Sequence, residues 1–86
     1  MFINKTQDGR NNLCGRRIAR FRTELRISQR ELADRLQLVG LDMDKNAIQR
    51  IEAGKRFVTD IEILGLARVL DKTVMELLFD ESEPFF

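Results

Sequence analysis

The sequence predicts an all-α fold, a compact bundle of five helices, and three observations support this prediction. Apolar residues recur at helical spacing from Leu13 to Phe79, and no strand-like alternation bounded by turn residues interrupts them. Residues 28–31, 59–62 and 73–76 each have the Ser/Thr-x-x-Glu pattern of a helix capping box, and each precedes an apolar run. The one proline lies outside this region, so no predicted helix contains a breaker.

The first predicted helix extends from about Leu13 to Leu25, and Asn12 is a candidate cap for it. Ile18 and Leu25 fall on one stripe at helical spacing, and Cys14 extends this stripe. We therefore interpret Cys14 as a small core residue rather than as a reactive thiol.

The second helix is predicted to follow the capping box in which Ser28 and Glu31 bond each other's backbone amides, and to end at Gly40. Glycine suits this position because it readily adopts the left-handed conformation that ends many helices. The third helix is predicted to follow the cap Asp44 and to end at Gly54. Its apolar positions are Ala47, Ile48 and Ile51.

The last two predicted helices each begin at a capping box, with Thr59 for the fourth helix and Thr73 for the fifth. Each has an apolar face that can complete a core. In the fourth helix this face consists of Ile63, Leu64, Ala67 and Leu70. In the fifth helix it consists of Val74, Leu77 and Leu78.

The chain is expected to have three segments. Residues 1–12 are polar and show no sustained period, which predicts a flexible N-terminal arm. Residues 13–79 form the helical domain, and residues 80–86 form an acidic tail that contains Phe85 and Phe86. These two aromatic residues would fold back on the core, join a dimer contact or fray.

The composition excludes most catalytic and metal-binding chemistry. With no His and one Cys, the chain cannot assemble a Ser-His-Asp site, a Cys-His site or a zinc site. Its glycines form neither a G-x-G-x-x-G nor a G-x-x-x-x-G-K phosphate loop. We therefore predict no enzymatic activity, no cofactor and no metal. The 86 residues make one small domain and leave no room for a separate domain that senses a small molecule.

The cellular setting predicted by the sequence is the cytoplasm. No apolar run is long enough to cross a bilayer, and no secretory signal follows Met1, so no membrane partner is expected. One cysteine cannot form a disulfide within the chain, as is typical of proteins in a reducing compartment.

The net charge of +1 conceals a strong asymmetry along the chain. Residues 1–56 contain 13 Lys and Arg against 7 Asp and Glu, a balance of +6, whereas residues 57–86 contain 2 against 7, a balance of −5. Such a division is expected of a protein with a basic surface for a polyanion, and solvated helix faces also produce it.

The second and third predicted helices, joined by a short turn that contains Gly40, have the arrangement of a helix-turn-helix. The polar face of the third helix contains no acid and offers Lys, Arg, Asn and Gln side chains. Lys and Arg suit guanine edges and Asn and Gln suit adenine edges, so this face can read bases, although any amphipathic helix has a polar face. Its residues are Lys45, Asn46, Gln49 and Arg50.

Three parts of the chain, taken in order, carry a family resemblance. They are IARFRTELRISQRELA at residues 18–33, AIQRIEAGKR at residues 47–56, and the pair LARVL at residues 66–70 and MELL at residues 75–78. Together they resemble the Cro/lambda-repressor-like (XRE) family over about residues 15–79. The resemblance implies a five-helix DNA-binding domain that acts as a homodimer in bacterial or phage transcription control.

The resemblance also assigns roles to individual residues, and it implies base contacts by the four residues of the polar face. The residues assigned to the DNA backbone, by the resemblance or by the basic surroundings of the third helix, are Gln29, Arg30, Lys55 and Arg56. Of these, Gln29 would also brace the third helix. Arg22 and Glu52 match a structural ion pair, and loss of one partner of such a pair costs about 3–5 kcal/mol where it is buried.

The sequence departs from the family pattern between its second and third helices, where it contains five additional residues. Residues 37–41 are the natural candidates for this insertion. Either they lengthen the second helix by about one and a half turns, so that Gly40 ends it and Leu41 makes a hydrophobic cap contact, or the helix stops near Leu38 and a longer loop follows.

We therefore predict a sequence-specific double-stranded DNA-binding transcriptional regulator. In this hypothesis it is a repressor that acts as a homodimer on a palindromic operator, with the helix at about residues 45–53 in the major groove. The alternative is a protein-interaction module, such as an antitoxin or a phage accessory protein, that retains the fold. A salt-dependent affinity for DNA distinguishes the two hypotheses.

Overall fold

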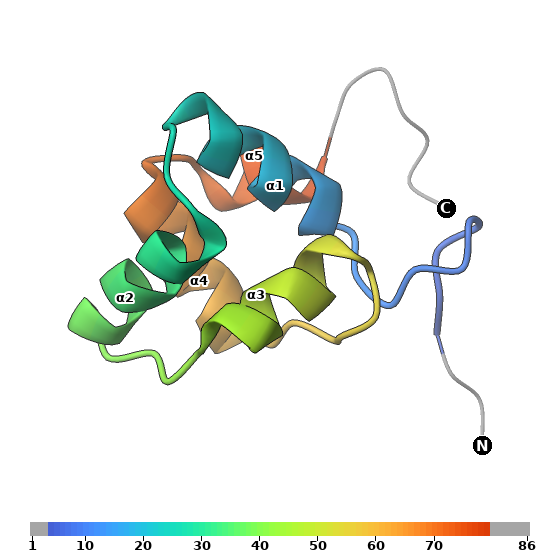
Figure 1. Ribbon diagram of the computed structural model, residues 1–86. Helices are drawn as coiled ribbons and strands as arrows, with labels where there is room; N and C mark the ends of the chain where they lie inside the picture. The colour runs from blue at the N-terminus through green and yellow to red at the C-terminus, as the bar shows by residue number, and fades with distance from the viewer. Residues whose placement is uncertain (1–3, 80–86) are drawn as a thin grey trace.

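The computed structural model describes residues 4–79 and, within that range, consists of five α-helices without strands (Figure 1). The helices are α1 (Gly15–Glu24), α2 (Gln29–Leu38), α3 (Lys45–Glu52), α4 (Asp60–Leu70) and α5 (Val74–Leu78). This confirms the predicted all-α bundle. Residues 1–3 of the predicted arm and the predicted tail at residues 80–86, with its two phenylalanines, lie outside the described residues. None of the helices in residues 4–79 has the length and apolar character that a bilayer span requires.

The predicted caps of the last three helices are confirmed. Asp44, Thr59 and Thr73 each accept the backbone amide of the residue three positions later. In α4 and α5 the capping box is complete, because Glu62 and Glu76 accept the amide of the capping threonine in return, at 2.9 and 3.0 Å. These reciprocal bonds satisfy amides that the helix itself leaves without a partner.

The starts of the first two helices differ from the prediction. At α2, the Ser28 hydroxyl accepts the amide of Glu31 at 3.0 Å, but the Glu31 side chain does not return the bond, so the capping box is half-formed. The first helix begins at Gly15 rather than at Leu13. The reason is that Asn12 accepts the amide of Gly15 at 2.8 Å and closes a turn before the helix.

The core forms where α1, α2, α3 and α4 meet, and α5 packs against α1 and α4 (Figure 1). Its largest fully buried side chains are those of Ile18, Leu32, Leu36, Met43, Ile48, Ile51, Leu66, Leu70, Leu77 and Cys14. Burial raises the pKa of the Cys14 thiol to about 11, in agreement with its predicted place in the core. Two predicted core residues are instead exposed, Leu25 to 45% and Leu64 to 63%. On α4 the buried face contains Leu66, and Leu64 points away from it.

The linker between α2 and α3 contains most of the insertion. The helix ends at Leu38, so the second alternative, a longer loop, describes it better than an extension by one and a half turns. Gly40 has a φ of +90° and donates to the Gln37 carbonyl, while the Leu41 amide donates to the Leu36 carbonyl. This is the bonding pattern of a Schellman cap, and it confirms the predicted role of Gly40.

The linker also packs onto the bundle. Leu41 lies so close to α4 that a Cβ atom on Gly65 would be 2.1 Å from its Cδ1. Met43, two residues later, is 2% exposed. Two apolar anchors therefore fix the longer linker, and it delivers the chain to Asp44 at the start of α3.

Substitution of Gly40 by alanine is expected to lower the free energy of unfolding by about 1–2 kcal/mol, because an L-residue is strained at this φ. The added Cβ would meet no atom within 4 Å, so strain is the only cost. Arg26, with a φ of +59°, gives the opposite test: Arg26→Gly should raise the free energy of unfolding by about 0.5–1 kcal/mol. Urea titrations followed by circular dichroism measure both changes, and equal midpoints for the two variants would contradict them.

Candidate nucleic-acid interface

The outward face of α3 consists of polar side chains that the fold does not use. Ile48 and Ile51 are fully buried on the opposite face, against α1 and α2. The four residues predicted to contact bases are all exposed, and within the described part of the chain none of their side chains makes a hydrogen bond or ion pair. They are Lys45, Asn46, Gln49 and Arg50. The structure thus presents four side chains that suit base edges on one exposed helical face.

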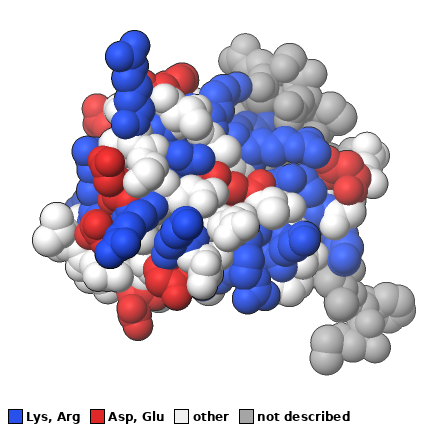
Figure 2. Space-filling view, in the orientation of Figure 1, with Lys and Arg blue, Asp and Glu red and all other residues white. Residues whose placement is uncertain are grey.

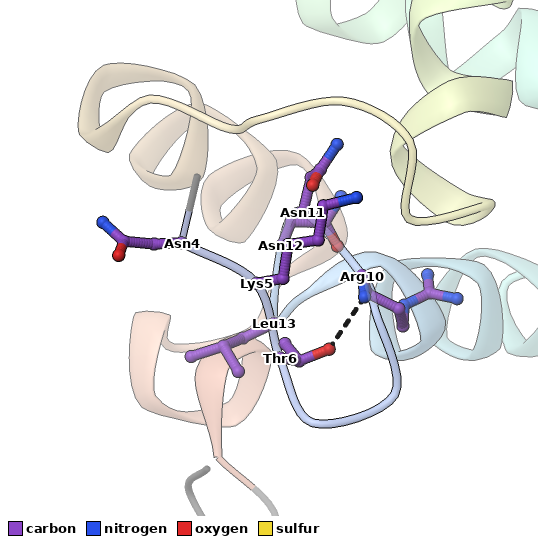
Figure 3. A pocket seen from close by; sticks show the side chains of 7 residues that line it. All are labelled: Asn4, Lys5, Thr6, Arg10, Asn11, Asn12 and Leu13. Carbon is purple, nitrogen blue, oxygen red and sulfur yellow. Dashed lines mark hydrogen bonds between the residues drawn. The ribbon is translucent and has the colours of Figure 1, made fainter. Parts of the chain in front are cut away.

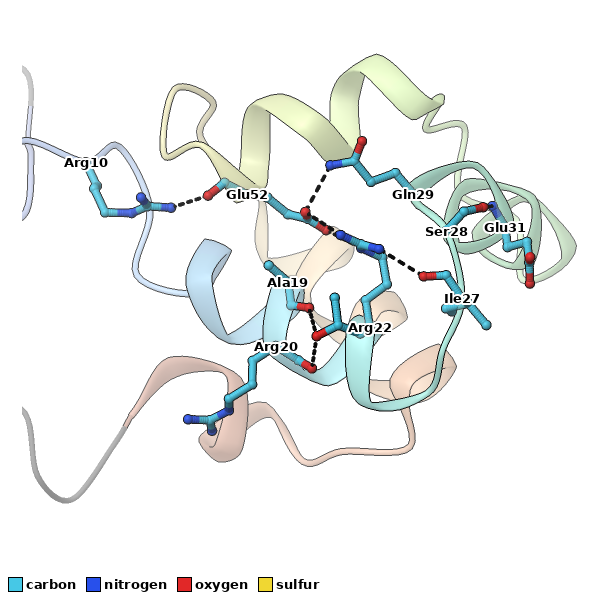
Figure 4. A network of polar contacts seen from close by, with 10 residues as sticks. Arg10, Ala19, Arg20, Arg22, Ile27, Ser28, Gln29, Glu31 and Glu52 are labelled. Carbon is cyan, nitrogen blue, oxygen red and sulfur yellow. Dashed lines mark hydrogen bonds and ion pairs between the residues drawn. The ribbon is translucent and has the colours of Figure 1, made fainter.

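Glu52, at the end of α3, connects three elements through its carboxylate (Figure 4). Arg22 from α1 donates to both of its oxygens, with distances of 2.7 and 3.0 Å, and also to the Ile27 carbonyl at 2.9 Å. Gln29, at the start of α2, donates to Glu52 Oε1 at 3.0 Å. The side chains of Arg22 and Glu52 are 15% and 9% exposed, and the hydrogen-bonded carboxylate raises the pKa of Arg22. This bidentate pair holds α3 against α1 and α2.

The four residues assigned to the DNA backbone occupy different environments. Arg30 and Lys55 are exposed, and their side chains have no partner within the described residues. Gln29 uses its amide on Glu52. Arg56 is half-buried and forms a bidentate pair with Glu62, at 3.0 and 2.9 Å, that lowers the pKa of the Glu62 carboxyl. The structure therefore leaves two of the four side chains fully available and engages the other two within the fold.

Residues 10–12 are the last three residues of the segment predicted as an arm. These three residues, here called the strap, pass along the end of α3 and bond to it. Asn12 is 8% exposed, and its side-chain amide donates to the carbonyls of Ile51 and Arg56 at 3.0 and 2.8 Å. The backbone amide of Asn11 donates to the Gly54 carbonyl at 2.8 Å. An open pocket lies beside the strap, and Figure 3 shows the Thr6 hydroxyl in it, bonded to the amide of Arg10.

The charge on this face of the molecule is mixed rather than uniformly basic. Figure 2 shows Lys and Arg side chains across the face on which α3 lies, with acidic side chains gathered mainly toward the side of α2. Several of the basic groups are paired within the chain, because Arg16 bonds Asp8 at 2.9 Å in addition to the two bidentate pairs. The exposed lysines and arginines of α3 and of the residue after its cap are among the unpaired charges left for an anionic ligand.

Two helices joined by a capped turn, the second with an unengaged polar face and basic neighbours, define a DNA-binding domain of the helix-turn-helix class. The comparison with family profiles agrees: residues 18–77 match the helix-turn-helix family of Cro/lambda-repressor-like (XRE) proteins, and the chain belongs to this family. It is a DNA-binding helix-turn-helix regulator. No curated protein and no solved structure matches the chain significantly.

Two features of this region escaped prediction from the sequence. The sequence predicts an arm here because Asn11 and Asn12 belong to no periodic pattern, and their partners at the end of α3 and in the turn after it lie 39 to 44 residues away along the chain. The Arg56–Glu62 pair is six residues apart and depends on the turn between α3 and α4. The one signal for the Arg56–Glu62 pair in the sequence was Glu62 at the third position of the predicted fourth helix, and this position indicated only a helix cap.

Replacement of Glu52 by alanine is expected to lower the free energy of unfolding by about 3–5 kcal/mol, because it leaves the largely buried Arg22 guanidinium without its carboxylate. Thermal unfolding of the variant, followed by circular dichroism, measures the loss. Glu31→Ala is the matched control: it removes an exposed Glu that bonds nothing through its side chain within the described residues, and should change stability by less than about 0.5 kcal/mol. Equal losses for both variants would contradict the role given to Glu52.

Proposed function

We propose that the protein is a transcriptional repressor that binds a palindromic operator as a homodimer, with α3 in the major groove of each half-site. The observation that supports this proposal best is the set of four unengaged polar side chains on the exposed face of α3. A dimer bound in this way would exclude polymerase sterically. Its two α3 helices would meet half-sites about 34 Å apart, one helical turn of DNA.

The base contacts in this proposal follow from side-chain chemistry. Lys45 and Arg50 are proposed to donate to guanine O6 and N7, and Asn46 and Gln49 to form bidentate bonds with adenine. The four side chains lie on an eight-residue helix, and an acid does not occur among them. Phosphate repulsion is therefore absent from the face that would enter the groove.

The contacts with the DNA backbone are proposed for the four residues assigned to it from the sequence. The environment of each side chain indicates which of them are best placed to make such a contact. Lys55 and Arg30 have exposed side chains without internal partners, so they are the first candidates for phosphates. Gln29 retains a second amide hydrogen after its bond to Glu52, and Arg56 retains donors beyond its pair with Glu62. We propose that these two contact phosphates while they continue to brace the fold.

The proposed dimer surface consists of apolar side chains on α4 and α5. Ile61, Leu64 and Met75 are 68%, 63% and 62% exposed, values far above those of the core. Ile61 and Leu64 are three residues apart on α4 and so share its outward side. Large exposed apolar side chains favour association, and a second copy of the chain is the partner that a palindromic site requires.

Selection of bound sites from a random duplex pool, followed by titration of the selected DNA at several salt concentrations, tests the function. Recovery of a palindrome that binds orders of magnitude more tightly than random DNA is the expected result. Absence of enrichment, with weak binding at most, would overturn the proposal. It would favour the alternative, a protein-interaction module that uses the exposed apolar face of α4.

Substitutions at Arg50 and Lys55 are expected to separate base reading from backbone binding. Arg50→Ala should cost about 1–3 kcal/mol on the selected site and relax the preference at one base pair. Lys55→Ala should weaken binding to all DNA about equally and lower the salt slope by about 1. Fluorescence anisotropy with selected and random duplexes measures both effects. Equal losses on both duplexes for Arg50→Ala would identify it as a phosphate contact instead.

Leu64→Glu is expected to weaken self-association by about 2 kcal/mol or more, because it places a charge in the proposed apolar interface. Sedimentation velocity over a range of protein concentrations measures this change in the absence of DNA. Leu38→Glu is the control, since Leu38 is 87% exposed on α2 and should leave self-association unchanged. The interface assignment would fail if the two variants associated equally well.

A further inference from the structure

The strap occupies the end of α3 and the turn that follows it, and it lies outside the residues that match the family. Gly54 has a φ of +76° and ends α3 in a Schellman cap, in which the Lys55 amide donates to Arg50 and the Gly54 amide to Ile51. Lys55 is the first residue after this cap and has an exposed side chain. The direction in which Lys55 projects therefore depends on how firmly the turn is held.

The strap supplies donors to nearly every carbonyl of this turn. The acceptors are the carbonyls of Ile51, Glu52, Gly54, Lys55 and Arg56. Asn12 spans the turn, because its one amide group bonds a carbonyl at each end of it. The Ile51 carbonyl also accepts the Gly54 amide, but the other four would otherwise bond water, which does not hold the chain in a fixed position.

Arg10 holds the middle of the turn. Its guanidinium donates to the Glu52 carbonyl at 2.6 Å, and its side chain lies across Gly54, where a Cβ would be 2.7 Å from Arg10 Cζ (Figure 4). Asn11 bonds the carbonyl of Lys55 itself at 3.2 Å. The strap thus contacts the backbone on both sides of the glycine and at the lysine.

We propose that the strap is a positioning element for DNA binding, and that Asn12 is a positioning residue that aims Lys55 at a phosphate. This inference rests on the proposed function, in which Lys55 contacts the DNA backbone. A lysine whose backbone is already held has only its side chain to order when DNA binds, so the contact is stronger than one from a free loop. The strap itself need not touch DNA.

A double-mutant cycle between Asn12→Ala and Lys55→Ala tests the proposal. Both the strap residue and its replacement are uncharged, so Asn12→Ala changes no electrostatic attraction directly. Binding to a mixed-sequence duplex is sufficient, because a phosphate contact does not depend on the operator. The expected result for Asn12→Ala is an affinity about tenfold lower with a salt slope lower by about 1, and less than about a twofold further loss in the Lys55→Ala background.

Thr73→Ala is the matched control for a loss of stability alone. It removes the bond from the Glu76 amide to the Thr73 hydroxyl in the α5 cap, on an element that packs against α1 and α4. All variants are compared at a temperature at which circular dichroism shows them folded. If Asn12→Ala does not fold, Asn11→Ala replaces it, because this variant loses the bond to the Lys55 carbonyl and retains the backbone bond to Gly54.

The outcomes separate the proposal from the function on which it rests. An unchanged salt slope for the strap variant, with the same loss of affinity in both backgrounds, would overturn the positioning role while wild-type binding remained salt-dependent. A similar loss for Thr73→Ala would overturn it as well, because stability alone would then explain the effect. Wild-type protein without salt-dependent DNA affinity would instead overturn the proposed function, and the positioning role with it.

Discussion

The arrangement of the domain depends on one carboxylate, that of Glu52. It accepts three hydrogen bonds from two side chains, Arg22 and Gln29, and so connects the end of α3 with α1 and the start of α2. A charge as little exposed as this is costly to bury unless it is fully paired, and here the pairing is bidentate. The same bonds that satisfy Glu52 hold α3 in place against α1 and α2. The stability of the fold and the position of its exposed polar face are therefore consequences of one contact.

A second constraint is the short length of α3. A helix of eight residues satisfies few of its own carbonyls through bonds within the helix. The residues that follow its last helical turn are not helical and cannot supply regular partners. The Schellman cap at Gly54 and the strap together account for the carbonyls from Arg50 to Arg56 except that of Ala53. Donors from outside the helix-turn-helix thus stabilise the end of the helix that the motif cannot complete alone.

The success of prediction from the sequence followed the range of each interaction along the chain. Caps such as Thr59 and the glycine cap of α2 at Gly40 were predictable because donor and acceptor lie within a few residues. The Arg22–Glu52 assignment came from the family resemblance, since 30 residues separate the partners. The prediction from periodicity that Leu64 lies in the core was wrong. Apolar residues occur on both the buried and the outward side of α4, so their spacing did not distinguish the two sides. The bonds of Asn12 could not be predicted, because they require the folded position of the chain after α3.

The internal use of basic residues changes the meaning of the charge asymmetry. Of the 13 basic residues in residues 1–56, Arg16, Arg22 and Arg56 are paired with acids, and Arg10 bonds a backbone carbonyl. These side chains build the surface and contribute less to attraction of a polyanion than their number implies, since a paired charge is largely compensated at short range. Of the basic groups that remain unpaired, Lys45, Arg50 and Lys55 lie on the outward side of α3 and just after it. A few unpaired side chains on a firmly held helix favour contacts with DNA at defined positions over general electrostatic attraction to it.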